Sequence, residues 1–205
     1  KKAEDILSQI KEMLSEKHDE AELALTPDHL YHLKAKGKRA IMLGVENGYA
    51  IGRDITQLQR LREAGVVYMT LCHNGNNDIC DSCRNTENEH NHNGVSEFGA
   101  QVIREMNRLG MMVDLSHASE KSFYDAISLS KVPIVCSHSS CKHLCDHPRN
   151  LNDEQMRLLT ETFKSFANNG ANLPEDKKAR LKEINQELGL LELKFSNNVV
   201  AETNA

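Results

Sequence analysis

The feature that most constrains the fold is a set of four short apolar runs separated by amphipathic stretches. The runs occupy residues 40–45, 66–71, 111–115 and 133–136, and the amphipathic stretches occupy residues 54–64, 97–109 and 119–129. Continuous apolar runs of this length are typical of strands buried on both faces, as in a parallel sheet. Strand–helix alternation of this kind indicates βα units. We therefore expect an α/β fold with about four βα units.

Each apolar run is followed by a residue that can bind a metal. Glu46 follows the first run, His73 the second, His117 the third and His138 the fourth. In α/β barrels and open α/β sheets, the carboxyl ends of the strands form the edge where ligands and metals bind. A single histidine there is more often a hydrogen-bonded core residue, but a ligand-type residue after every run predicts a site. One carboxylate and three imidazoles suit zinc or a similar metal.

The composition excludes several classes of protein. A net charge of -5, no Trp and only 4% aromatic residues argue against a nucleic-acid-binding surface. No run approaches the ~20 apolar residues that span a bilayer, so we expect no transmembrane segment. The 205 residues are also fewer than the roughly 250 of a complete (β/α)8 barrel. The compartment stays open between cytoplasm and periplasm, because a leader could have been removed.

The C-terminal part has a different pattern, and all six Cys and ten His lie at or before residue 147. Two apolar seams follow at heptad-type spacing, namely Met156, Leu159, Phe163 and Phe166, then Leu181, Ile184, Leu188, Leu191 and Phe195. Asn152 and Gln155 resemble a capping box, and Gly170 suits a helix end. We therefore expect a helical hairpin and two domains, 1–159 and 160–205. Helical periodicity also predicts helices at residues 3–14 and 26–36.

The cysteines suggest a second, weaker metal candidate. Cys80 and Cys83 precede His90 and His92 in a polar stretch. A zinc finger needs its two histidines three to five residues apart, whereas these are separated by one residue. We therefore interpret the cysteines as ordinary reduced thiols.

Several segments resemble the membrane (renal-type) dipeptidase family. They are residues 44–52, 71–78, 105–117, 137–140 and 148–151, in the order of the family, and the resemblance spans about residues 25–159. It implies a (β/α)8-type metallo-hydrolase barrel with two zinc ions that cleaves dipeptides, often with tolerance for a D-residue at the second position. The expected substrate is thus a small peptide.

The resemblance also implies roles for individual residues. Glu46 would bridge the two metals, and His117 and His138 would complete the ligands of one of them. His73 would contact the tetrahedral intermediate as a catalytic residue. Arg149 would bind the carboxylate of the substrate, for which its planar fork is suited.

The chain departs from the family pattern at two places. The family's His-x-Asp pair, which belongs to the other metal site, is absent, and so is the late-strand Asp that acts as a proton shuttle. We therefore expect a partial barrel and a zinc-dependent dipeptidase segment that is weak or inactive on its own.

The tail, residues 160–205, resembles a helical stretch of the thimet oligopeptidase/peptidyl-dipeptidase family. The catalytic His-Glu-x-x-His of that family is absent, so no activity carries over. Two alternatives to a dipeptidase stay open. One is a non-catalytic helical interaction module or fragment that covers its exposed apolar faces by self-association. The other is a different metallo-hydrolase of the same barrel type, such as a deaminase or a lactonase.

Overall fold

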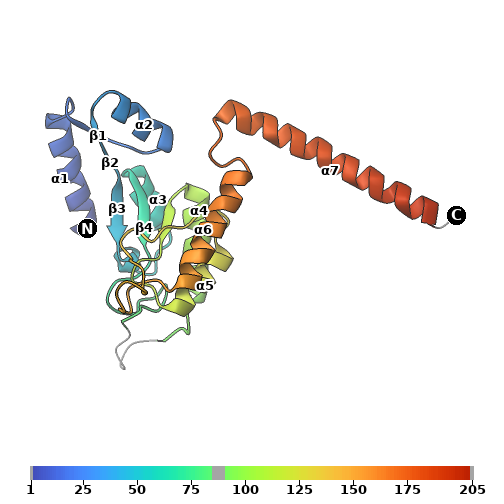
Figure 1. The fold of residues 1–205 in the computed structure, drawn as a ribbon. Coiled ribbons are helices and arrows are strands. Elements are labelled where there is room, and N and C mark those ends of the chain that lie inside the picture. The colour runs from blue at the N-terminus through green and yellow to red at the C-terminus, as the bar shows by residue number, and fades with distance from the viewer. Residues whose placement is uncertain (1, 85–90, 204–205) are drawn as a thin grey trace. The chain divides into compact units, whose positions relative to one another are not determined.

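The computed structural model describes residues 2–84 and 91–203 (Figure 1). The helices are α1 (Lys2–Glu16), α2 (Pro27–Ala35), the 3₁₀ turn η1 (Gly48–Ile51), α3 (Thr56–Glu63), α4 (Glu97–Leu109), α5 (Glu120–Leu129), α6 (Asp153–Asn168) and α7 (Glu175–Thr203). The strands are β1 (Ala21–Leu23), β2 (Arg39–Ile41), β3 (Leu43–Glu46), β4 (Val66–Thr70) and β5 (Met112–Asp114). The chain divides into two compact units, Lys1–Leu159 and Thr160–Ala205, and each is described by itself.

The central element of the first unit is a parallel sheet in the order β3-β4-β5. Its register pairs Glu46 with Thr70 and Thr70 with Asp114, so the three strands end at the same level. Because α3 and α4 connect consecutive strands, all three carboxyl ends meet at one edge of the sheet. This is the arrangement that the alternating sequence pattern predicts.

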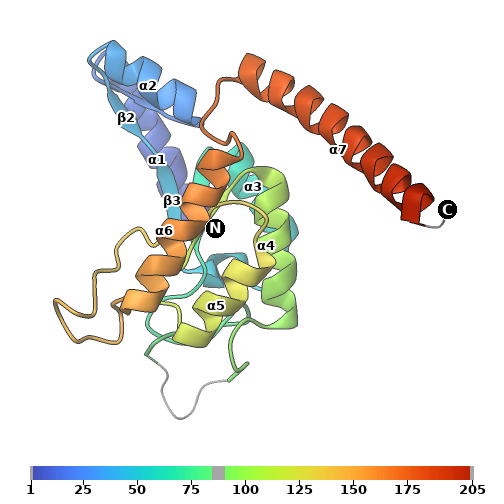
Figure 2. The same cartoon turned by 45° about the vertical axis from the view of Figure 1, so that its right-hand side comes forward.

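Helices α3, α4 and α5 lie side by side against this sheet (Figures 1 and 2). The face of α4 that the sequence predicts to be apolar supplies the buried residues Val102, Ile103 and Met106. Ser96 caps the helix by accepting a hydrogen bond from the Gly99 N–H, which satisfies a free donor of the first turn. The helix therefore begins and ends where the pattern predicts, and its apolar stripe forms the centre of the core.

The strands complete the core with side chains that water does not reach. Val66, Met69, Leu71 and Val113 are fully buried, and Leu7 of α1 joins the same cluster. Gly44 is required by close packing within the sheet, since an added Cβ would lie 2.0 Å from Cζ of Tyr68. The Tyr68 ring thus occupies the space that any other residue at position 44 would need.

The run at residues 40–45 does not form one strand as predicted. It divides into β2, which pairs with β1 in a separate parallel sheet, and β3, which pairs with β4. Met42 lies between them and is 47% exposed, so the run is not continuously buried. Strand β1 was not predicted at all, because Ala21–Leu23 contains a central, exposed Glu22 and no apolar run.

The fourth predicted strand, residues 133–136, contributes a single parallel bridge between Val135 and Asp114. Pro133 has no N–H to donate, and the Ser137 N–H bonds to the Asp114 carboxylate, so the ladder cannot extend in either direction. The described residues form sheets of two and three strands, with helices on them. The fold is mixed α/β with parallel sheets, and the partial barrel is not confirmed.

The second unit begins within α6 and contains α7. The capping box at the start of α6 is confirmed, because Asn152 and Gln155 exchange hydrogen bonds of 2.9 and 2.8 Å between side chain and backbone. Both predicted helices are present, but Leu188, Leu191 and Phe195 of the second seam are exposed, and a packed hairpin is not confirmed. Among the helices that the structure describes, none combines the length and the apolar character needed to cross a membrane.

Candidate metal centre

The site lies at the carboxyl edge of the three-stranded sheet. Glu46 is the last residue of β3, and His73 follows β4 by three residues. His117 follows β5 by three residues, and His138 follows the Val135 bridge by three residues. Chain topology alone therefore brings the four predicted residues to one edge.

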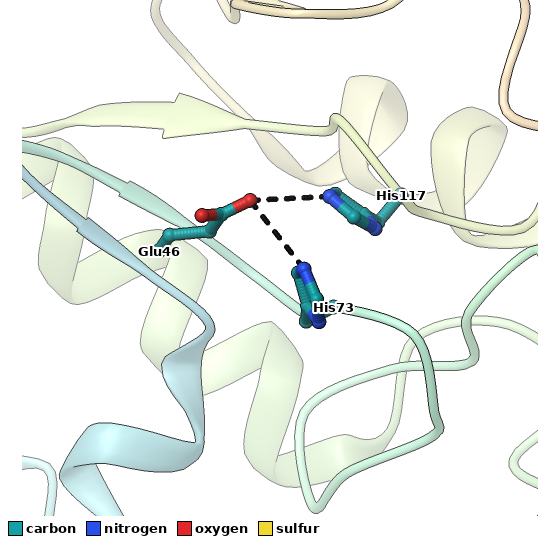
Figure 3. Close-up of side chains that lie close together, drawn as sticks. All are labelled: Glu46, His73 and His117. Carbon is teal, nitrogen blue, oxygen red and sulfur yellow. Dashed lines mark hydrogen bonds and ion pairs between the residues drawn. The ribbon is translucent and has the colours of Figure 1, made fainter.

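One carboxylate oxygen is the centre of the cluster. Oε1 of Glu46 lies 3.1 Å from Nε2 of His117, 3.2 Å from Nε2 of His138 and 3.8 Å from Nε2 of His73. Figure 3 shows the carboxylate of Glu46, at the end of β3, facing the imidazoles of His73 and His117, which follow β4 and β5. Donors at ~2.0–2.2 Å around a tetrahedral zinc ion lie roughly 3.3 Å from one another, so the spacings of Glu46 to His117 and of Glu46 to His138 match those of two ligands of one ion.

The backbone at His117 adopts a conformation that is unusual for a residue with a side chain. Its φ is 71°, in the left-handed region that L-residues with a Cβ rarely adopt. The carbonyl of His117 accepts a hydrogen bond from the Cys83 N–H at 2.8 Å and a weaker one, at 3.2 Å, from Ser82 Oγ, whose single proton also faces the carbonyl of His73 at 2.5 Å. These bonds come from the loop after β4, and they stabilise the turn that directs the imidazole toward Glu46.

His117 is held as a neutral imidazole. Its pKa is lowered to about 4, mainly because burial disfavours the charged ring and next because of the positive charge of Arg149. The negative charge of Glu46 raises the pKa of His117, but by less than the other causes together lower it. A neutral imidazole is the form that binds a metal, so the environment of His117 favours ligand chemistry.

A buried carboxylate lies directly behind the site. Asp114 is fully buried and accepts hydrogen bonds from Thr70, Ser116 and Ser137. Burial acts to raise the pKa of Asp114, but these hydrogen bonds outweigh it and the pKa lies below its usual value. The sequence interpretation missed this residue. The available signal was an acid inside an apolar run, because a buried carboxylate needs several donors.

Arg149 approaches the site from the segment before α6. Its Nη2 donates to the carbonyl of His138 at 3.4 Å, and its Nε is buried with no hydrogen-bond partner in the described part of the chain. The guanidinium therefore has donor capacity left for a ligand.

The donor set fits a divalent metal ion. The ligand atoms of Glu46, His73 and His117 all lie within 4.8 Å of one another, and His138 touches the same carboxylate oxygen. Mixed nitrogen and carboxylate donors are typical of zinc. Within residues 2–84 and 91–203, this is the single group of its kind. For the alternative site, His90 lies outside the described residues, and Nε2 of His92 is 2.8 Å from the Asn77 carbonyl.

Comparison with known proteins agrees with this geometry. The family model described as membrane dipeptidase (peptidase family M19) matches residues 1–163, so the match starts earlier than the resemblance in the sequence indicates. The chain is 38% identical over 157 residues to dipeptidase tcpJ of Claviceps purpurea, and 37% identical over 141 residues to dipeptidase verJ of Clonostachys rogersoniana. These matches cover 77% and 69% of this chain and 36% of each relative, so the chain spans about a third of their length.

Solved structures show the same relationship. The probable dipeptidase PvdM of Pseudomonas aeruginosa is 32% identical with a TM-score of 0.72, covering 76% of this chain and 40% of PvdM. An amidohydrolase of the same organism is 28% identical with a TM-score of 0.70, covering 76% of this chain and 46% of that one. The fold and its strand-end cluster are those of a metallopeptidase-type α/β protein. The chain belongs to the membrane dipeptidase family, peptidase family M19.

Proposed function

We propose that this chain is the metal-binding segment of a zinc-dependent dipeptidase, with Glu46, His117 and His138 as zinc ligands. The observation that carries the proposal is the approach of one Glu46 oxygen to Nε2 of both histidines, at 3.1 and 3.2 Å. Membership of the dipeptidase family supports the substrate class. When bound, a zinc ion would supply a Lewis acid that activates water and polarises a carbonyl group.

The remaining residues act on the substrate. His73 has a 41% exposed side chain beside Glu46, so an Nε2–H on its ring would donate to the oxygen of a tetrahedral intermediate. Arg149 would bind the terminal carboxylate of a dipeptide through its free donor capacity. Both groups orient the substrate relative to the ligand cluster and contribute no metal ligand in this assignment.

We expect the chain to be weak or inactive on its own. The family's second metal uses a His-x-Asp pair that is absent from this sequence, and the late-strand Asp is absent as well. With one metal, the paired activation of water and leaving group is lost.

The test is zinc binding by isothermal titration calorimetry, followed by hydrolysis of dipeptides with L- or D-residues at the second position. We expect one zinc per chain, with affinity reduced about 10- to 100-fold or more in Glu46→Gln. Glu187→Gln on exposed α7 is the matched control and should bind like the wild type. Absence of zinc binding by the wild-type chain would overturn the proposal.

The exposed seam of α7 supports a second candidate, an interaction module that self-associates. Leu188, Leu191 and Phe195 are 50%, 61% and 71% exposed at heptad-type spacing. Light scattering should then show a concentration-dependent oligomer that Phe195→Asp dissociates, whereas a monomer at all concentrations would contradict this candidate. The comparisons do not support the resemblance of residues 160–205 to the thimet oligopeptidase family, and the dipeptidase family match reaches only residue 163.

A further inference from the structure

A chain of hydrogen bonds leads from the buried Asp114 to the rim histidine. Ser137 Oγ lies 2.6 Å from Oδ2 of Asp114 and 2.7 Å from Nδ1 of His138. The other ring nitrogen of His138, Nε2, lies 3.2 Å from the Glu46 carboxylate. The three groups thus connect the core of the sheet to the candidate ligand atom.

The direction of this chain follows from counting protons. Asp114 accepts five hydrogen bonds: Oδ1 takes those of the Ser116 N–H, Ser116 Oγ and Ser137 N–H, and Oδ2 takes those of Thr70 Oγ1 and Ser137 Oγ. A carboxylate that accepts from five donors carries no proton of its own. Ser137 has one hydroxyl proton, and it points to Asp114. A lone pair of Ser137 Oγ therefore faces Nδ1 of His138.

The tautomer of the ring is then determined. Because Ser137 offers a lone pair, Nδ1 of His138 must carry the hydrogen, and a neutral ring leaves Nε2 without one. The lone pair of Nε2 consequently faces Oε1 of Glu46, two electron-rich atoms 3.2 Å apart. Such a pair is unfavourable by itself and becomes favourable when a cation binds to both atoms.

The same carboxylate also positions the backbone of His138. Ser116 Oγ donates to Asp114 at 2.9 Å and accepts the His138 N–H at 3.1 Å. Ser137 and His138 are themselves exposed, so this part of the rim depends on Asp114, which is buried, for its geometry. The carboxylate of Asp114 in β5 therefore positions both the ring of His138, through Ser137, and its main chain, through Ser116.

We propose that Asp114, acting through Ser137, is a positioning residue that keeps His138 in the Nδ1–H tautomer with Nε2 free for a cation. This inference rests on the proposed metal centre for its purpose, but its direct readout is the protonation of one ring in the metal-free protein. Asp114 touches neither the substrate nor the ion.

Asp114→Asn provides a sharp test because it should reverse the chain of hydrogen bonds. Two backbone N–H groups bind at Oδ1 and cannot rotate, so the amide oxygen of Asn must take that place. The amide NH₂ then faces Ser137 and donates to it. The Ser137 hydroxyl turns and donates to Nδ1, which leaves the hydrogen of His138 on Nε2.

The experiment is long-range ¹H–¹⁵N NMR of the full, histidine-labelled chain without metal, at a pH where the ring is neutral. We expect Nδ1–H at His138 in the wild type, and Nε2–H in both Asp114→Asn and Ser137→Ala. Ser137→Thr keeps the hydroxyl and should keep Nδ1–H. Ser140→Ala, the same change at an exposed serine that takes no part in the network, is the control.

Zinc titration of the same samples separates the two proposals. Asp114→Asn and Ser137→Ala should weaken zinc binding about 10- to 100-fold, while Ser137→Thr and Ser140→Ala should bind like the wild type. A wild type with Nε2–H, or a tautomer that does not change in either variant, overturns the positioning role. A wild type with Nδ1–H that binds no zinc overturns the metal centre and leaves the hydrogen-bond assignment intact.

Discussion

The sheet β3-β4-β5 and helix α7 both carry regular apolar patterns, but these patterns end in opposite environments. In the sheet and its helices, Met69, Met106 and Val113 are fully buried. In α7, Leu188, Leu191 and Phe195 repeat just as regularly and are exposed. An apolar pattern therefore specifies which secondary-structure element forms. How much that element contributes to stability depends on whether another surface packs against its apolar side chains.

The largest expected effect is the loss of stability on truncating a buried side chain of the first region, compared with truncating an exposed side chain of α7. Met106→Ala should lower the free energy of unfolding by about 2–5 kcal/mol, because it leaves a cavity at a fully buried position. Leu191→Ala should change it by less than about 0.5 kcal/mol, because Leu191 is 61% exposed. Urea unfolding measures both, and equal effects would remove the contrast between the two regions.

The second expected effect is a dependence on pH that comes from the sheet edge. The pKa of His117 is lowered to about 4, below its unfolded value near 6.5. Between these values the unfolded chain binds the extra proton, so the free energy of unfolding falls as the pH decreases, by about 1–3 kcal/mol.

Urea unfolding of the metal-free chain across this pH range measures that dependence. His117→Asn tolerates the left-handed backbone and should give a shallower pH dependence than the wild type. An identical dependence in the two proteins would mean that His117 is not buried in its neutral form.

The third expected effect differs in sign between the regions and includes the smallest change in stability. Gly44→Ala should destabilise the sheet by about 1–3 kcal/mol, because its Cβ would overlap the Tyr68 ring. Gly189→Ala should stabilise α7 by about 0.5–1 kcal/mol, since the added Cβ would meet nothing within 4 Å beyond its chain neighbours and its own helix backbone, and alanine favours helix. Thermal unfolding followed by circular dichroism distinguishes them, and two changes of the same sign would contradict the comparison.

The sequence predicts helices better than strands in this chain, for a physical reason. A helix such as α4 carries its own pattern of burial and its own caps, so local information defines it. A strand depends on its neighbours, and residues 133–136 form one bridge because the adjoining donors are absent or bound to Asp114. The short strand β1 has no apolar run, and its pairing with β2 is visible only in three dimensions.

Much of the candidate site is also visible in the sequence. Glu46, His73, His117 and His138 follow the apolar runs, and parallel strands bring such positions to one edge. The chain of hydrogen bonds from Asp114 through Ser137 to His138 cannot be predicted from the sequence pattern. It depends on the register between β5 and Val135 and on the direction of individual protons, which no spacing rule encodes.

The carbonyl bonds that hold His117 in its left-handed turn have a consequence for protein engineering. The Cys83 N–H bonds to the main chain of a different loop, and Ser82 Oγ lies between the carbonyls of His73 and His117. The segment after β4 therefore holds in place a loop that it does not follow in sequence. Anyone who grafts a foreign loop there must retain both contacts. Without them we expect His117 to relax to a right-handed backbone, which would move its imidazole away from the carboxylate of Glu46 although no residue of the cluster had been changed.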